Sequence, residues 1–448
     1  MQNGPLRLPR SLPLPALLGA IFGIVPMHLA QAATLLVTDC GDGVDSGTLR
    51  NTVAVAPDNS TIQIPLTCST ITIAGDIFIP NTISNMTIAG QGASVTTIDA
   101  NRAGRAFYSF HTGGDLEFKD LTIANGYYSG APVPLGGCIY GVGNVVISNA
   151  VVTACTIAPT ASSTATPRGG GIFSLGAISV FNSTVSGNVA VGVETTSAQG
   201  GGLFAAGGIV VSYSTVSGNA VFSGASGPPT HGGGIVSAGR SVLILRSTIS
   251  GNKADENSAL HVTGSASYGV LIDASTITGN VATSFQTVGS YLPVHVTSST
   301  IAFNRVASSN GSTPAGLYSS EQISMNDSIF AANTAKMGSA NDVSSSAASS
   351  PLIGSTNLIT ATSNPVPLGT LSACPRLGHL SNNGGPTLTI PLLANSPALD
   401  AGTDDGDVFD QRGFSRPVGA GMDLGAYERQ PGTIDDVIFY GAFESRCD

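Results

Sequence analysis

Apolar residues alternate with polar ones at every second position through the middle of the chain. Alternation with period two predicts strands that bury one face, and the β-branched residues at these positions favour strands further. No segment shows the period of an amphipathic helix over a useful length. The alternating apolar pairs are Ile178 and Val180, Ile209 and Val211, Val242 and Ile244, Val270 and Ile272, and Val294 and Val296.

These strands belong to a repeating unit. A unit begins with three glycines and an apolar residue, as in Gly169–Ile172, and ends with Ser-Thr-apolar-x-Gly-Asn, as in Ser183–Asn188. The closing asparagines are separated by 31, 33, 28, 24 and 29 residues; they are Asn188, Asn219, Asn252, Asn280, Asn304 and Asn333. A constant motif at unequal spacing predicts a solenoid with loops of variable length at one edge, as in Val189–Gln199 and Val221–Thr230.

We therefore predict an all-β fold, a right-handed parallel β-helix (a pectin-lyase-like solenoid) with a cap at each end. Coils of short strands stack about 4.8 Å apart, so identical positions lie above one another. An inward asparagine at each bend would bond to the asparagine of the next coil and form a ladder. The neighbouring glycine permits the turn conformation. The competing interpretation is that these asparagines and glycines contact sugar or metal.

The composition supports this fold and excludes some partners. Only 10% of the residues are charged, Trp is absent, and the net charge is −10. Loss of the two arginines before residue 33 leaves 15 basic against 27 acidic side chains. Such a balance disfavours nucleic acid and anionic lipid as partners. We expect no transmembrane segment in the mature chain.

Residues 1–32 resemble a secretion signal. Arg7 and Arg10 precede the apolar stretch Leu12–Val25, and Ala30–Ala32 has the small-x-small pattern of a cleavage site. The alternative, a membrane anchor, needs a longer apolar run of about 20 residues. We therefore expect an exported protein, extracellular or associated with the outer membrane.

The open ends of a parallel stack require caps. Thr48–Ala56 predicts a short amphipathic capping helix with Leu49 and Val53 on one face. The first strands then follow at Thr61–Ile64, Ser69–Ile73, Met86–Ile88 and Thr96–Ile98.

Several motifs occur in a familiar order. They are Gly47–Val53, Thr97–Phe107, Gly136–Tyr140, the Gly-Gly-Gly repeats, Leu380–Gly402, Asp410–Pro417 and Asp423–Glu428. In this order they resemble bacterial exported β-helix proteins with a C-terminal domain of the choice-of-anchor Q type. The repeats also resemble those of chlamydial polymorphic outer-membrane proteins. The resemblance implies a signal peptide at 1–32, a cap and first coils at 33–110, repeats at 111–335, a C-terminal block at 336–430 and a tail at 431–448.

The six cysteines of an exported chain favour disulfides over metal ligands. Alignment of the repeats places Cys138 at a glycine position and Cys155 at the asparagine position of one coil, which predicts a disulfide; two buried thiols are the alternative. Cys40 and Cys68 flank the capping helix and form the second predicted pair. The two remaining cysteines, Cys374 and Cys447, form the third predicted pair.

Few outward residues of the aligned strands carry groups that could catalyse a reaction. The aspartate pairs and Gly-His-Gly of polygalacturonases and the Trp-Ile-Asp-His of pectate lyases are missing. Asp273 and His295, on neighbouring coils and offset by two positions, are the candidates for acid–base catalysis, or else a surface pair. The exposed apolar residues Phe181, Leu243 and Leu245 are candidates for stacking on sugar, unless the C-terminal block covers them.

A cluster of aspartates near the C-terminus is a candidate Ca²⁺ site, with Asp404, Asp405, Asp407 and Asp410 as ligands. It lacks the spacing and the terminal Glu of an EF-hand. The alternative is a solvated loop in which Asp410–Gly413 forms a turn and Arg412 pairs with a carboxylate. We expect no other cofactor.

Two functions are compatible with these observations. The first is an exported or surface-associated β-helix with a non-catalytic role in binding or adhesion, whose partner is an extracellular polysaccharide or a component of the cell surface. The second is a carbohydrate-active enzyme, a polysaccharide lyase or a glycoside hydrolase, which rests on analogy of fold alone.

Overall fold

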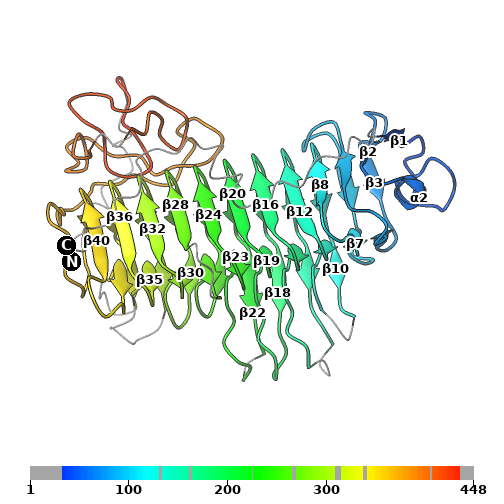
Figure 1. Cartoon of the computed structure of the whole chain (residues 1–448), viewed down its shortest axis with the longest axis horizontal. Helices are drawn as coiled ribbons and strands as arrows, with labels where there is room; N and C mark the ends of the chain where they lie inside the picture. The colour runs from blue at the N-terminus through cyan, green and yellow to red at the C-terminus, as the bar shows by residue number, and fades with distance from the viewer. Residues whose placement is uncertain are drawn as a thin grey trace, which may run out of the picture.

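The computed structural model describes residues 33–433 except 131–133, 161–163, 225, 265–268, 308–313, 336–340 and 404–405. The predicted signal peptide and Cys447 lie outside this range. The chain winds into a right-handed parallel β-helix whose strands form four sheets of twelve, eleven, eight and ten strands, called sheets 1 to 4 in the order in which a coil visits them (Figure 1). The predicted fold class is confirmed.

Every strand pairs in parallel with the equivalent strand of the next coil. Sheet 1 consists of β1 Thr34–Leu36, β2 Ser60–Gln63, β5 Met86–Ala89, β8 Asp115–Lys119, β12 Asn144–Ser148, β16 Ile178–Phe181, β20 Ile209–Ser212, β24 Val242–Leu245, β28 Val270–Asp273, β32 Val294–Thr297, β36 Ile323–Asn326 and β40 Leu352–Ser355. Sheet 2 consists of β3 Thr70–Thr72, β6 Thr97–Asp99, β9 Thr122–Ala124, β13 Val151–Thr153, β17 Thr184–Ser186, β21 Thr215–Ser217, β25 Thr248–Ser250, β29 Thr276–Thr278, β33 Thr300–Ala302, β37 Ile329–Ala331 and β41 Leu358–Ile359.

The other two sheets have shorter strands. Sheet 3 consists of β10 Tyr127–Tyr128, β14 Thr156–Ile157, β18 Val189–Val191, β22 Ala220–Phe222, β26 Lys253–Ala254, β30 Val281–Ala282, β34 Arg305–Val306 and β38 Thr334–Ala335. Sheet 4 consists of β4 Ile77–Ile79, β7 Phe107–Ser109, β11 Ile139–Gly141, β15 Ile172–Ser174, β19 Leu203–Ala205, β23 Ile235–Ser237, β27 Leu260–Val262, β31 Val288–Ser290, β35 Leu317–Ser319 and β39 Val343–Ser345.

The loops that the sequence places after each asparagine are shorter than expected. Val189–Val191 forms β18 and Phe222 ends β22, so the first residues of both predicted loops belong to strands of sheet 3. The true insertions begin after these strands and project from the lower edge of the solenoid in Figure 1. The physical reason is that alternating Val and Ala residues continue the ladder for two or three positions beyond the bend.

The core is apolar and lies between the four sheets. Inward residues stack in register, as when Val180 pairs with Val211 and Val211 with Ile244. All three are fully buried.

The predicted asparagine ladder runs along the bend between sheet 2 and sheet 3. The Nδ2 atom of Asn188 donates to Oδ1 of Asn219 over 2.9 Å, and the same bond recurs down the stack to Asn333. Asn333 then donates to Oδ1 of Asp342, which ends the ladder. The six asparagines are fully buried. They therefore satisfy one another and the backbone, which supports the structural interpretation of the repeat.

A second ladder, made of serines, was not predicted from the sequence. The backbone nitrogen of Ser183 donates to Oγ of Ser214 over 3.0 Å, and later serines repeat the contact as far as Ser328. These serines follow turn residues with positive φ, such as Tyr213 at 49° and Arg246 at 47°. Hydroxyl groups thus satisfy the backbone where the chain bends from sheet 1 to sheet 2.

The cap and two of the disulfides agree with the predictions. Leu49–Val55 forms α2, with Leu49 and Val53 buried against the first coils. Disulfides join Cys40 to Cys68 and Cys138 to Cys155. Cys374 is also disulfide-bonded.

The solenoid extends beyond residue 335, where the sequence analysis ended the repeats, because β39, β40 and β41 add to three of the sheets. The predicted C-terminal block began at residue 336; below, the name C-terminal block refers only to the chain that follows these strands, residues 362–433 without 404–405. In Figure 1 it is the orange and red segment over the strands of the last coils. Its apolar side packs on sheet 2 through a buried cluster of Ile329, Ala331, Leu358, Leu392, Ala398, Leu424 and Tyr427.

Polar contacts fix the block on sheet 2. The side chain of Gln411 bonds to the hydroxyl groups of Thr248 and Thr276 at 2.9 and 2.6 Å. The nitrogen of Ala426 donates to Oγ1 of Thr300 over 3.1 Å. The outward threonines of these strands are therefore docking points for the block.

Candidate functional site

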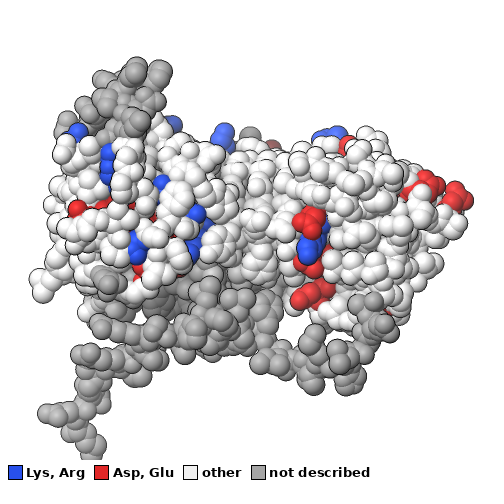
Figure 2. All heavy atoms as spheres, turned by 90° about the horizontal axis from the view of Figure 1, so that it is seen from above, with Lys and Arg blue, Asp and Glu red and all other residues white. Residues whose placement is uncertain are grey.

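Charged side chains are sparse on the solenoid. In Figure 2 most of the visible face is uncharged, and the charges gather over the C-terminal block and the N-terminal coils. None of the helices in the described residues is long and apolar enough to cross a membrane. The search for a site therefore starts from the few polar and aromatic clusters on the outer faces of the sheets.

The predicted sugar-stacking residues of sheet 1 are not available. Leu243 and Leu245 are only 6% and 8% exposed and form an apolar cluster with Val210. Phe181 is half-buried against the same cluster. The prediction that Leu243 and Leu245 are exposed is wrong. Leu243 lies between Val210 and Leu271 of the neighbouring coils, and Leu245 packs in the same apolar cluster, although its direct neighbours are Ser212 and Asp273.

Asp273 and His295 lie on β28 and β32 with the expected offset. Leu271 is the direct neighbour of His295, and Asp273 pairs with Thr297. Partial burial lowers the pKa of His295, whereas a carboxylate directly against the ring would raise it. The structure thus keeps Asp273 and His295 on one face of neighbouring strands, two positions apart.

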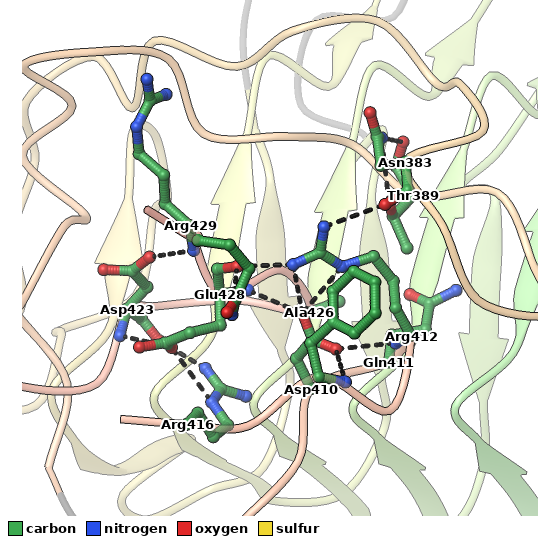
Figure 3. A network of polar contacts seen from close by, with 12 residues as sticks. Asn383, Thr389, Asp410, Gln411, Arg412, Arg416, Asp423, Ala426, Glu428 and Arg429 are labelled. Carbon is green, nitrogen blue, oxygen red and sulfur yellow. Dashed lines mark hydrogen bonds and ion pairs between the residues drawn. The ribbon is translucent and has the colours of Figure 1, made fainter. Parts of the chain in front are cut away.

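Asp410 is engaged within its own turn. Its two carboxylate oxygens accept hydrogen bonds from the backbone and the guanidinium of Arg412, from the nitrogen of Phe414 and from the nitrogen of Glu428. Figure 3 shows this network in the C-terminal block. Because these donors occupy its oxygens, Asp410 serves the turn rather than a cation.

The other proposed calcium ligands give no support to that site. Asp407 lies 3.9 Å from the guanidinium of Arg246, and Asp404 and Asp405 fall outside the described residues. No group of three or more potential metal ligands occurs among the residues that the structure describes.

Sheet 4 carries a strip of aromatic rings along its outer face. Tyr140 stacks on Phe173, and Phe173 on Phe204, with ring centroids 5.5 and 5.4 Å apart and nearly parallel planes. Tyr108 and Phe78 continue the strip toward the N-terminus at the same outward position of the strands. The register of the sheet therefore aligns five rings along the axis of the solenoid.

A second row of side chains covers part of this strip. Leu135, Arg168, Gln199, His231 and Glu256 form one bridge ladder just before the strands of sheet 4. The guanidinium of Arg168 lies 5.1 Å above the ring of Phe204, and Nε donates to Oε1 of Gln199. Phe173 and Phe204 are consequently only 1% and 3% exposed.

The strip is open where this covering row ends. Phe78 and Phe110 are 50% and 36% exposed, and Tyr108 and Tyr140 are half-buried beside them. The rings touch one another, with centroids 4.9 Å apart for Tyr108 and Phe110 and 5.9 Å for Phe78 and Phe110. We call these four residues the aromatic platform.

Arg105 contacts the two tyrosines of the platform. It is 3% exposed, and its guanidinium lies 3.4 Å above the ring of Tyr128 and 5.0 Å from that of Tyr108. Its NH1 atom is 3.1 Å from Asp76, and Nε donates to two backbone carbonyls. These contacts restrict Tyr108 and Tyr140 before any ligand arrives, which lowers the entropic cost of binding.

A pair of ionisable groups lies farther along the covering row. Nδ1 of His231 is 3.3 Å from Oε2 of Glu256, and its ring stacks on that of His261 with centroids 5.0 Å apart. Burial, and then the nearby His231, lower the pKa of His261 to about 3, so this ring is neutral in the folded protein. Nδ1 of His261 bonds to Asn257 over 2.6 Å.

The aromatic strip follows from a repeated position in the sequence. Tyr140, Phe173 and Phe204 each follow the apolar residue after the glycine run, so an aromatic residue recurs at one position of the repeat. The exposure of the first rings could not be read there, because it depends on where the covering row begins.

Comparisons with known proteins do not identify a family. No family model matches the chain, and no curated protein matches it. Among solved structures it is similar to the crystal structure of pectate lyase Pel9A, with 13% identity and a TM-score of 0.46, over 89% of this chain and 96% of that chain. This likeness carries no residue roles to the present chain, and the choice-of-anchor Q resemblance stays a prediction.

Proposed function

We propose that this protein is an exported β-helix that binds an extracellular polysaccharide through the aromatic platform. The observation that carries the proposal is the exposed group of four touching rings in a chain with few aromatics and no Trp. Contiguous exposed apolar surface is rare on soluble proteins and marks binding sites. The electron-rich ring faces attract the C–H groups of a pyranose ring. Disulfides, which persist outside the cytoplasm, support export.

The shape of the solenoid suits an extended polymer. The rings of Phe78, Tyr108 and Tyr140 succeed one another along the axis, about 4.8 Å per coil. The polar row of Arg168, Gln199, His231 and Glu256 continues in the same direction. A glycan that stacks on the platform and runs along the axis therefore meets hydrogen-bonding groups beyond it.

Affinity electrophoresis and pull-down with a panel of soluble and insoluble polysaccharides test this function. We expect retention by at least one polysaccharide and a loss of about tenfold in affinity, or about 1.4 kcal/mol, for Phe78→Ala with Tyr108→Ala. The matched control is Phe285→Ala, which removes a ring that is 46% exposed outside the platform. Equal affinity of the platform variant and the control would remove the proposal, as would the absence of any binding.

A second candidate function, hydrolysis of an ester group on the bound glycan, rests on His231 and Glu256. Nδ1 of His231 lies 3.3 Å from Oε2 of Glu256 but forms no hydrogen bond within the described residues, and this ring would accept a proton from water. The hydroxide oxygen would bond to the ester carbon, and the leaving alcohol would recover the proton. Release of acetate from an acetylated polysaccharide, abolished in His231→Gln and retained in Phe285→Ala, would establish it; no release would exclude it.

A further inference from the structure

A groove of about 480 Å³ lies on the outer side of sheet 3, away from the aromatic platform. Its floor is formed by β22, β26 and β30, and its walls by the loop after β22 and the turn after β30. The lining residues that matter below are Phe222, Lys253, Asp255, Val281, Thr283 and Ser284. The groove is thus framed by consecutive coils and by one of the loop insertions.

One cation, Lys253, lines this groove, and a second, Arg305, lies one strand beyond its floor. Lys253 is exposed at the outward position of β26, next to Val281, and Val281 pairs with Arg305 of β34, which is also exposed. The two charges are therefore two strand spacings apart, about 10 Å. Neither forms an ion pair within the described part of the chain, whereas Arg50, Arg105, Arg246, Arg412 and Arg416 all do.

The carboxylate of Asp255, which lines the groove, accepts hydrogen bonds from both walls. Oδ2 of Asp255 accepts from the nitrogen and the hydroxyl of Thr230, each over 3.0 Å. Oδ1 accepts from the hydroxyl of Thr283. Asp255 thus ties the loop after β22 to the turn after β30. Within the groove its charge is matched by that of Lys253, and Arg305 beside the groove adds a second positive charge.

An exposed ring completes the groove. Phe222, at the end of β22, is 50% exposed and lines the groove together with Lys253 and the hydroxyl-bearing Ser284. A cation, an aromatic face and hydroxyl groups around one groove match the parts of an acidic sugar, which are an anion, a ring with C–H faces and hydroxyl groups.

We propose that this groove binds an acidic saccharide, with its anionic groups at Lys253 and Arg305 and a sugar ring against Phe222. The spacing of the cations along the axis selects a ligand of at least two sugar units that carries more than one anionic group. The anion is a carboxylate or a sulfate. The inference rests on sheet 3 alone and is independent of the aromatic platform on sheet 4.

The test is titration calorimetry of the mature protein with tetrasaccharides that differ in charge: a tetragalacturonate for carboxylate, a chondroitin sulfate tetrasaccharide for sulfate, and cellotetraose as the neutral member. We expect one or both acidic ligands to bind at least tenfold more tightly than cellotetraose, and the affinity to fall as salt rises. The acidic ligand that binds more tightly identifies the anion.

Variants separate this site from the rest of the surface. Lys253→Met with Arg305→Met should lower the affinity for the acidic ligand at least tenfold, and Phe222→Ala should lower it severalfold. Arg240→Met removes an exposed cation outside the groove and should change nothing. Phe78→Ala with Tyr108→Ala should leave this affinity unchanged even if it abolishes binding at the platform. Undiminished affinity of the double charge variant, with its melting temperature preserved, would overturn the proposal, as would equal binding of cellotetraose.

Discussion

The solenoid and the C-terminal block bury their polar groups in different ways. In the solenoid most buried polar groups are neutral amides and hydroxyls that repeat once per coil, as in the ladder from Asn188 to Asn333, and Asp342 and Arg105 are exceptions. In the block they are charges that occur once, such as Arg416 and Glu428, both with fully buried side chains. A repeated neutral contact is satisfied by its own copy in the next coil, whereas a buried charge needs a specific partner elsewhere in the chain.

This difference predicts that the block is far more sensitive to a single substitution than the ladder. Arg416→Met leaves the carboxylate of Glu428 buried with two backbone donors, the nitrogens of Val418 and Asp423, but without its cation. Loss of one partner of a buried ion pair costs about 3–5 kcal/mol. We expect this loss in the free energy of unfolding, measured with urea, with the exposed Arg240→Met as the control.

The comparison would fail if Arg416→Met lowered the free energy of unfolding no more than Arg240→Met does. The double variant Arg416→Met with Glu428→Gln sharpens it, since removal of both charges should recover part of the stability that the single change loses. No recovery would mean that the other bonds of Arg416, to the carbonyls of Asp423 and Gly425, carry the stability.

A buried rung of the ladder should have an intermediate effect. Asn219→Ala removes the acceptor of the Asn188 side chain and the donor to Asn252, and it leaves buried polar groups unsatisfied. We expect a loss of about 1–3 kcal/mol in the free energy of unfolding. Shortening the loop Gly192–Ser197 by two residues should cost less than about 0.5 kcal/mol, because loop closure depends weakly on length. Equal losses for the two changes would contradict the role of the ladder.

The third contrast is a pH dependence of stability that has opposite sign in the two regions. Burial raises the pKa of Asp423 in the block to about 6, above its unfolded value of about 3.9. The folded state then binds more protons between these values, so its stability increases as pH falls from 7 to 4. His261 of the solenoid, with a pKa of about 3, is neutral when folded and gains a proton on unfolding below about pH 6.5. Its contribution to stability is therefore lost as pH falls.

Melting temperatures between pH 7 and 4 measure this contrast. Relative to Asp423→Asn, the wild type should gain stability on acidification, and relative to His261→Gln it should lose stability. Differences of the same sign for the two variants would show that the two regions do not titrate in opposite directions.

The fold could be predicted from the sequence wherever a position repeats. The register of sheet 1, the asparagine ladder and the Cys138–Cys155 disulfide follow from alignment of one coil with the next, because stacking brings equal positions together. The block offers no such alignment. Its docking through Gln411 on Thr248 and Thr276 joins residues far apart in sequence, and threonines at outward positions look like ordinary surface residues.

The candidate sites were harder to predict for a related reason. Leu243 and Leu245 have the outward register of exposed residues, yet apolar neighbours of the adjacent coils bury them. The exposure of Phe78 depends on the point at which a covering row of side chains begins, and the groove beside Phe222 depends on a loop that does not repeat. Exposure is a property of several coils together, which a repeat position alone does not encode.

The attachment of the block to sheet 2 also bears on the order of folding. Most contacts in the solenoid join residues about 24 to 33 positions apart, so coils can add one after another as the chain emerges. The bonds from Thr248 to Leu388 and Gln411 span 140 and 163 residues and can form only when the last coils are complete. The block therefore docks late in folding. Before the last coils can unfold from that end of the stack, the block must detach from sheet 2.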